Sequence, residues 1–238
     1  MSVRSYIDWV AQYVIWQVRN AFHWWQQKLS CHILPPVPQL NNPTIINSKV
    51  KFEELWDNLD DINILIVSII IDHHRSQNQD ISSIGLTTWD LRTNATISVS
   101  WHVDGTTPRS QDNFRFGLRK SVGKEEIGDC LKERLALYSV QYSKVFVFTY
   151  GVFSLNVLDE MCGKWQLHPI IVDLQAVQMV LTEASSAIPI SEYLSASFTK
   201  SASIMEKRDS GDDAYYIMDS VQAMVVVANN TLRWRRDA

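Results

Sequence analysis

The sequence predicts an α/β fold built on one mixed β-sheet with helices on its faces. Residues 62 to 71 form a nearly unbroken run of β-branched residues, and residues 144 to 149 and 169 to 172 are further short apolar runs. Such runs are typical of strands that are covered on both faces. Apolar residues with helical spacing follow each of the later runs. A group of consecutive strands followed by alternating helices and strands predicts this architecture.

The individual elements follow from periodicity and from turn residues. Residues 81 to 91 and 95 to 103 are two strand-like runs separated by the polar turn Arg92-Thr93-Asn94, and with the first strand they predict an antiparallel three-strand meander. The polar stretch from 104 to 123 is predicted to be a loop. Helices are predicted over residues 124 to 138, 153 to 165, 173 to 183, 190 to 198 and 212 to 227.

Composition limits what the protein does. A chain of 238 residues with 46% hydrophobic and 20% charged residues suits one sizeable core. Its 26 acidic and 22 basic residues give a net charge of -4, so nucleic acid would have to be held by a local basic surface. Cys31, Cys130 and Cys162 are far apart and show no zinc or disulfide spacing. Reduced thiols of this kind predict an intracellular protein, in the cytoplasm or the nucleus.

The first 33 residues predict an amphipathic, Trp-rich helix. Residues 4 to 30 contain no Gly or Pro. Apolar side chains recur on one helical face at Ile15, Val18, Phe22, Trp25 and Leu29. So broad an apolar surface needs a partner: the core, another protein or a membrane. Since the helix has no Lys/Arg-rich polar face and no long uninterrupted apolar run, we expect packing or a protein partner, with no signal peptide and no membrane span.

The domain organisation follows from the prolines after this helix. Pro35, Pro36 and Pro38 end it, because proline lacks the backbone donor and clashes with the preceding turn. We therefore expect a linker over residues 34 to 58, one domain over residues 59 to 230, and a basic tail over residues 231 to 238.

Several short motifs occur in a fixed order along the predicted domain. They are Ile71-Asp72-His73-His74, Asp112-Asn113-Phe114-Arg115-Phe116-Gly117, Val172-Asp173-Leu174-Gln175 and Arg208-Asp209-Ser210-Gly211-Asp212-Asp213. In this order they resemble the RNase H-like superfamily of DEDD-type 3′-5′ exonucleases. More closely, they resemble a fungal family of exonuclease-like domains whose yeast member is linked to mRNA export. The resemblance implies an RNase H-like mixed sheet, with the N-terminal helix as an addition.

The resemblance also implies which residues occupy the catalytic positions. Competent members carry an Asp-x-Glu pair on the first strand, an Asp on a later helix, and an Asp on the last helix that follows a general-base His. The corresponding positions here are Asp72, His74, Asn156, Arg208 and Asp213. Asp159 is the alternative to Asn156 if that alignment is shifted by a few residues.

This set of residues is poorly suited to two-metal phosphodiester hydrolysis. That mechanism needs two divalent cations about 3.5–4 Å apart, and Mg²⁺ prefers carboxylate oxygens. His74 offers an imidazole, which favours transition metals, and Asn156 removes a charge. Arg208 cannot act as a base, because its guanidinium remains protonated. We expect no resident cofactor, and Mg²⁺ or Mn²⁺ held by Asp72 and Asp213 if the protein is active.

Each acidic residue also has a structural interpretation. Asp72 can end a strand and bond a turn, and Asp213 suits the first turn of a helix, where an acid is favoured by the helix dipole. His73 and His74 can be a solvated pair at the strand end. For Asp173 we favour a helix N-cap over a catalytic role.

Basic and aromatic residues lie close together between residues 114 and 120. Phe114, Arg115, Arg119 and Lys120 combine stacking rings with cations, which predicts a contact surface for single-stranded RNA or DNA. The alternative is a solvated loop fixed by Phe114 and Phe116.

Three functional hypotheses follow. The first is a nucleic-acid-binding pseudo-nuclease, a catalytically impaired exonuclease homologue. The second is an active metal-dependent 3′-5′ exonuclease that uses Asp72, Asp213 and a third carboxylate, Asp159 or Asp212. The third is a protein-interaction module without affinity for nucleic acid, as the acidic net charge would allow.

Overall fold

A computed structural model of the chain describes residues 43–59, 61–73, 80–104, 116–182, 189–190 and 209–236. Residues 39–220 form one compact unit, and residues 1–38 with 221–238 form another. Of the second unit only the end of the last helix is described. The predicted N-terminal helix, most of the helix predicted for residues 190 to 198, and His74, Phe114, Arg115 and Arg208 lie outside the described residues.

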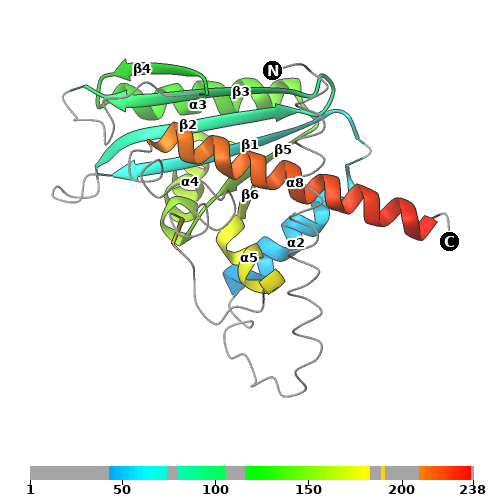
Figure 1. The fold of residues 1–238 in the computed structure, drawn as a ribbon. Helices are drawn as coiled ribbons and strands as arrows, with labels where there is room; N and C mark the ends of the chain where they lie inside the picture. Colours follow the sequence, from blue (N-terminus) through cyan, green and yellow to red (C-terminus); the bar gives the residue numbers. More distant parts are fainter. Residues whose placement is uncertain are drawn as a thin grey trace. The chain divides into compact units, whose positions relative to one another are not determined.

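The main unit contains a six-stranded mixed sheet with the strand order β4-β3-β2-β1-β5-β6 (Figure 1). Its strands are β1 (Ile64–His73), β2 (Ile81–Asp90), β3 (Ala95–Val103), β4 (Leu118–Val122), β5 (Lys144–Thr149) and β6 (Ile170–Asp173). The first three form an antiparallel meander, and β5 and β6 are parallel to β1. The structure confirms the predicted α/β fold with a mixed sheet of antiparallel and parallel strands.

Helices cover both faces of this sheet. They are α2 (Pro43–Asp57), α3 (Glu126–Gln141), α4 (Val152–Trp165), α5 (Leu174–Thr182) and α8 (Ser210–Arg236). Side chains of α3 and α4 pack on one face, which we call the inner face. On the other face Phe52 of α2 contacts Phe148 of β5, and the first turns of α8 contact β1 and β2. We call this second side the α8 face.

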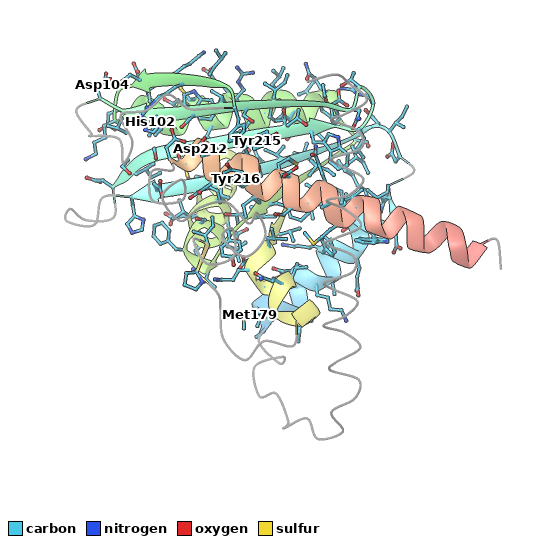
Figure 2. All side chains as sticks on the ribbon, in the orientation of Figure 1. His102, Asp104, Met179, Asp212, Tyr215 and Tyr216 are labelled. Carbon is cyan, nitrogen blue, oxygen red and sulfur yellow. The ribbon has the colours of Figure 1, made fainter. Side chains whose placement is uncertain are left out.

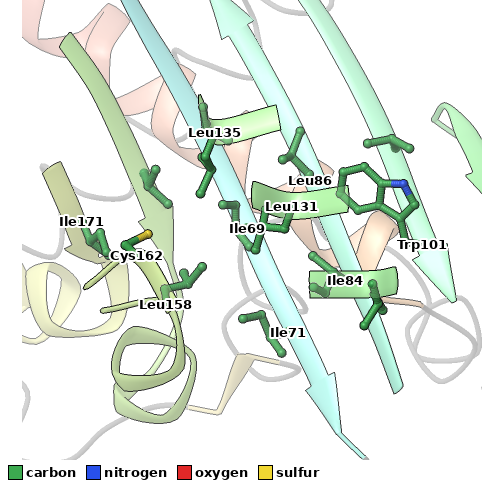
Figure 3. Packing of buried hydrophobic residues seen from close by; sticks show 14 of the residues in the cluster. Ile69, Ile71, Ile84, Leu86, Trp101, Leu131, Leu135, Leu158, Cys162 and Ile171 are labelled. Carbon is green, nitrogen blue, oxygen red and sulfur yellow. The ribbon is translucent and has the colours of Figure 1, made fainter. Parts of the chain in front are cut away.

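The inner face carries the main hydrophobic core. Alternate residues of β1 point to it, among them Val67 and Ile69, which are fully buried. They pack with Leu131 and Leu135 of α3 and with Leu158 of α4 (Figure 3). The uninterrupted apolar sequence of β1 is thereby explained, because its other residues are covered from the α8 face.

The α8 face is polar where α8 begins. Ser68 of β1 is completely buried, and its hydroxyl donates a hydrogen bond of 2.6 Å to the carbonyl of Ala214 in α8. In the next row of the sheet, Gly85 of β2 lies directly under the backbone of Ser210 and Gly211, so a Cβ atom at position 85 would overlap the Ser210 carbonyl group. The start of α8 therefore rests on the sheet with no side chain between the two backbones at this point.

Two predicted irregular segments are regular in the structure. Residues 43 to 57, assigned to the linker, form α2, which begins at Pro43 and buries Ile45, Phe52 and Leu55. The predicted loop over residues 104 to 123 contains β4, an edge strand that is mostly exposed on both sides, which explains why its sequence lacks an apolar alternation. Helix α8 also runs through Arg236, into the predicted tail.

We predict that Gly85→Ala lowers the free energy of unfolding by about 3 kcal/mol or more, because the new methyl group would force α8 away from the sheet. Denaturant unfolding would measure this change. Gly163→Ala is the matched control, since a Cβ there meets nothing within 4 Å and Gly163 lies in a helix. It should be neutral or stabilise by roughly 0.5–1 kcal/mol. Equal effects at the two positions would contradict the proposed close contact.

Candidate functional site at the start of helix α8

Asp72 is the second-to-last residue of β1 and lies on the α8 face. It is paired with Ser83 of β2, whose hydroxyl lies 3.5 Å from Asp72 Oδ2, and the register of the two strands shifts immediately after it. His73 follows the irregularity, and its ring packs against Phe153 in the first turn of α4, with 4.4 Å between the ring centroids. The alternative role, in which Asp72 ends the strand and bonds a turn, differs from the structure, because β1 continues to His73 and Asp72 accepts its hydrogen bond from Ser83 of β2. The side chain of Asp72 shares a sheet face with the start of α8.

The first turn of α8 brings three more carboxylates to the same side of the sheet. Asp209, Asp212 and Asp213 are all buried. Asp209 is the N-cap: its Oδ1 accepts the Asp212 N–H at 2.9 Å, and its carbonyl accepts the Asp213 N–H at 3.0 Å. Figure 2 shows Asp212 in these turns over the strands, together with Tyr215 and Tyr216. Asp213 occupies a first-turn position, as expected.

A buried histidine binds the capping carboxylate. His102 of β3 places Nε2 at 3.3 Å from Asp209 Oδ2 and at 2.8 Å from Ser100 Oγ. A serine, a histidine and an aspartate thus lie in contact, but this is no nucleophilic triad. In a triad the imidazole uses one nitrogen for the nucleophile and the other for the acid, whereas here both contacts use Nε2. Ser100 is also completely buried, so the arrangement holds the helix start.

Arg119 of β4 lies on the same face of the sheet as this cluster. It is paired with Ser100 in the β3–β4 ladder, so its side chain points to the α8 face, and its Nη2 atom is buried. Burial raises the pKa of Asp209, but hydrogen bonds from His102 and from the Asp212 N–H, together with the charges of His102 and Arg119, outweigh this effect. The pKa of Asp209 is therefore held below its ordinary value, and the carboxylate is ionised at neutral pH.

Aromatic contacts fasten the residues before β4 to the same helix. The Phe116 ring stacks on Tyr215 of α8 with 3.9 Å between centroids and 3° between planes, and it meets Tyr216 edge-on. One face of the Phe116 ring is therefore already occupied by protein. This favours, for Phe116, the structural role of fixing the loop.

The structure separates the residues predicted for the nucleic-acid surface. Arg119 and Lys120 are adjacent in a strand, so their side chains point to opposite faces of the sheet. Lys120 is exposed on the inner-face side, where it lies near Cys130 of α3. These two cations cannot contact one strand of nucleic acid from a common face.

The two candidates for the third catalytic carboxylate position, Asn156 and Asp159, are also separated from the acidic residues at the start of α8. Asn156 and Asp159 lie on the exposed side of α4, the helix that packs through Leu158 on the inner face. Asp72 points to the opposite face. Neither residue of α4 shares a sheet face with Asp72.

A divalent cation is poorly accommodated by these residues. Within residues 43–59, 61–73, 80–104, 116–182, 189–190 and 209–236, no group of three or more His, Cys, Asp or Glu side chains could hold a metal ion. Asp209 already binds His102 and a backbone N–H. The donor set expected for Mg²⁺ or Mn²⁺, several carboxylate oxygens converging on one point, is not assembled in the described residues.

Asp173 has the structural role that its sequence position predicted. Its Oδ1 accepts the N–H groups of Gln175, at 3.0 Å, and of Gly151, at 2.8 Å. It thereby caps α5 and also fixes the residue that precedes α4, where Gly151 has a φ of 91°. Burial raises the pKa of Asp173, although these backbone hydrogen bonds lower it.

Ser100, His102 and Asp209 were not predicted as site residues from the sequence. A usable signal was present: on β3 the polar residues Ser98, Ser100 and His102 alternate with apolar ones, which indicates a strand with one polar buried face. The partner of that face could not be inferred, because Asp209 is more than one hundred residues away along the chain.

Comparison with known proteins adds no relative: no protein-family model and no curated protein matches this sequence. Among the helices that the structure describes, none is long and apolar enough to cross a membrane.

We predict that Asp209→Asn, which keeps the capping oxygen and removes the charge, lowers the free energy of unfolding by about 2 kcal/mol at pH 7. Because the pKa of Asp209 is lowered by folding, its contribution is complete above its ordinary value of 3.8 and is lost as the pH falls through the lower folded-state value. Urea unfolding at several pH values should therefore show the two proteins converging below pH 3.8.

Asp159→Asn is the control, since Asp159 is exposed on α4. It should change stability by less than about 0.5 kcal/mol at every pH. A difference between wild type and Asp209→Asn that persists unchanged into the acid range would contradict the charge-based account.

Proposed function

We propose that this protein is a nucleic-acid-binding, RNase H-like domain in which exonuclease catalysis is impaired. The domain would use the shape of the nuclease fold to bind single-stranded RNA or DNA without cleaving it. Any protein partner would be bound through the predicted N-terminal helix.

The sheet supports the fold part of the proposal. An antiparallel meander, followed by two strands parallel to β1, is the arrangement that the motif resemblance implies. The last helix also begins against β1 and β2, so Asp72 and Asp213 lie on one side of the sheet, as that resemblance requires.

Catalysis is proposed to be impaired because of one observation: the acidic residues at the start of α8 are buried and bound within the protein. Asp209 is only 4% exposed and is bound by His102, while Asp213 is only 7% exposed. A catalytic carboxylate must reach a metal ion and, through it, a phosphate from solvent. The position aligned with the third carboxylate, Asn156, lies on the other side of the sheet.

The binding part of the proposal rests on the segment before β4. Phe114 and Arg115 combine a ring that bases can stack on with a cation for phosphate. Arg119 no longer belongs to this surface, because it points to the buried carboxylates. Binding should accordingly be weak and governed by salt.

A protein-interaction module is the second candidate, and one observation favours it. Ile97 of β3 and Leu118 of β4 are each 67% exposed, and the register places them as neighbours on the inner-face side of the sheet edge. Exposed apolar residues at a sheet edge are suited to contact with another protein. This candidate becomes the better account if nucleic acid is not bound.

The test is incubation of labelled single-stranded RNA and DNA with the protein and Mg²⁺ or Mn²⁺, beside its Asp72→Ala and Asp213→Ala variants. We expect no cleavage above that of the two variants. We also expect binding with a Kd of roughly 10⁻⁴–10⁻⁶ M at physiological salt, which weakens as salt is added. Metal-dependent cleavage that both substitutions abolish would establish an active exonuclease and overturn the proposal.

A second comparison locates the binding surface. Replacing Phe114 and Arg115 by Ala should weaken binding about tenfold or more, since one base stacked on an aromatic ring contributes about 1–3 kcal/mol. Lys132→Ala, which removes an exposed cation from α3, is the matched control and should leave the affinity almost unchanged. An equal loss in the two proteins would indicate nonspecific attraction.

A further inference from the structure

The edge of the sheet at β4 is a formed strand with one open side. Among the strands that the structure describes, β4 pairs only with β3, and its residues Leu118, Lys120 and Ser121 are exposed. An edge strand presents a row of unpaired backbone N–H and C=O groups, to which a further extended segment can bind. The open side of β4 is therefore a candidate surface for strand addition.

Contacts at both ends hold β4 in place. Just before its start, the Phe116 ring stacks on Tyr215 of α8 with 3.9 Å between the ring centroids. At its end, the Val122 carbonyl accepts the Asp104 N–H at 2.9 Å, and the Ser121 hydroxyl donates to the Asp104 carboxylate. The register with β3 is unbroken along the whole strand. A strand that is already ordered loses little conformational entropy when a second strand binds to it.

The side chains of β4 define the chemistry of a complementary segment. The register with β3 places Leu118, Lys120 and Val122 on the inner-face side of the edge. They form an apolar, a basic and an apolar position in succession, and exposed Ile97 of β3 lies beside the first. No carboxylate of the described residues forms an ion pair with Lys120. An acidic residue between two apolar ones would match this side, because opposite charges form stabilising cross-strand pairs.

We propose that β4 binds an extended segment of another protein, which adds a further strand to the sheet. This segment carries an acidic side chain opposite Lys120, with an apolar side chain on either side of it. The surface is separate from the predicted N-terminal helix and needs no nucleic acid, so the inference goes beyond the proposed function.

A second copy of this chain is a poorer occupant of the same edge. In a symmetric pair of two β4 strands centred on this segment, each Lys120 would lie opposite its own counterpart. Like charges directly opposite each other destabilise a strand pair. Lysine on an edge strand is a common means of preventing such self-association. The charge that disfavours a second copy favours an acidic partner.

The test is a titration of the full chain with two blocked peptides, followed through its backbone amide NMR signals. The peptides are Thr-Val-Thr-Glu-Thr-Val-Thr and Thr-Val-Thr-Lys-Thr-Val-Thr. We expect the glutamate peptide to bind in the millimolar range and about threefold or more tightly than the lysine peptide, since the central pair changes from attraction to repulsion. The largest shifts should lie at β4, residues 118 to 122.

Two charge reversals test the pairing directly. Lys120→Glu should reverse the preference, so that the lysine peptide binds more tightly. Lys132→Glu is the matched control, because it makes the same change at an exposed lysine of α3, and it should keep the preference of the wild type. Both positions are exposed, and the amide spectra show that each variant is folded before peptide is added.

Several results would overturn the inference. They are binding of neither peptide, a loss of preference in Lys132→Glu equal to that in Lys120→Glu, and shifts that lie away from β4. A concentration-dependent dimer in sedimentation whose formation changes in Lys120→Glu would mean that a second copy occupies the edge. No readout involves an oligonucleotide, so failure of the proposed function would be recognised separately.

Discussion

The α8 face of the structure depends on one contact, the packing of the first turn of α8 directly on the sheet. A helix start leaves four backbone N–H groups without partners, and burying them is costly unless a capping group accepts them. Asp209 supplies that group for Asp212, while Ser68 binds the Ala214 carbonyl from below. Gly85 allows this approach, because no other residue would leave room for the backbone of Ser210. The polar row on β1, β2 and β3 is thus the surface that receives the helix.

The same contacts explain why a carboxylate cluster survives in the interior. His102 and a backbone N–H bind Asp209, and the charge of Arg119 also favours its ionised form. Together these effects outweigh the burial penalty that would otherwise raise the pKa of Asp209. Each of these partners also reduces the ability of the carboxylate to bind an external cation. Stability of the helix start and accessibility of its acids are therefore opposed, and the structure favours stability.

The sequence predicted what depends on local periodicity and failed where partners are distant. The β-branched run of β1, the meander and the N-cap role of Asp173 each follow from a short segment, and the structure confirms them. Helix α2 was missed because its apolar positions, such as Phe52 and Leu55, lie among polar residues that follow several prolines. The direction of Arg119 toward the α8 face was missed because it depends on the register of an edge strand that has little apolar alternation. Of the predicted site, the common side of Asp72 and Asp213 was implied only by the family resemblance, and the burial of Asp213 depends on tertiary contacts that no short segment indicates.

Internal cations and bound metals stabilise an acidic cluster in different ways. A metal adds stability that rises with its concentration and vanishes when it is removed, since it is a ligand of the folded state. A cation carried by the chain is always present, at the cost of desolvating both partners. The edge strand β4 is also linked to α8, because the ring of Phe116, which lies two residues before β4, stacks on Tyr215. A change at the start of α8 should therefore also disturb this edge of the sheet.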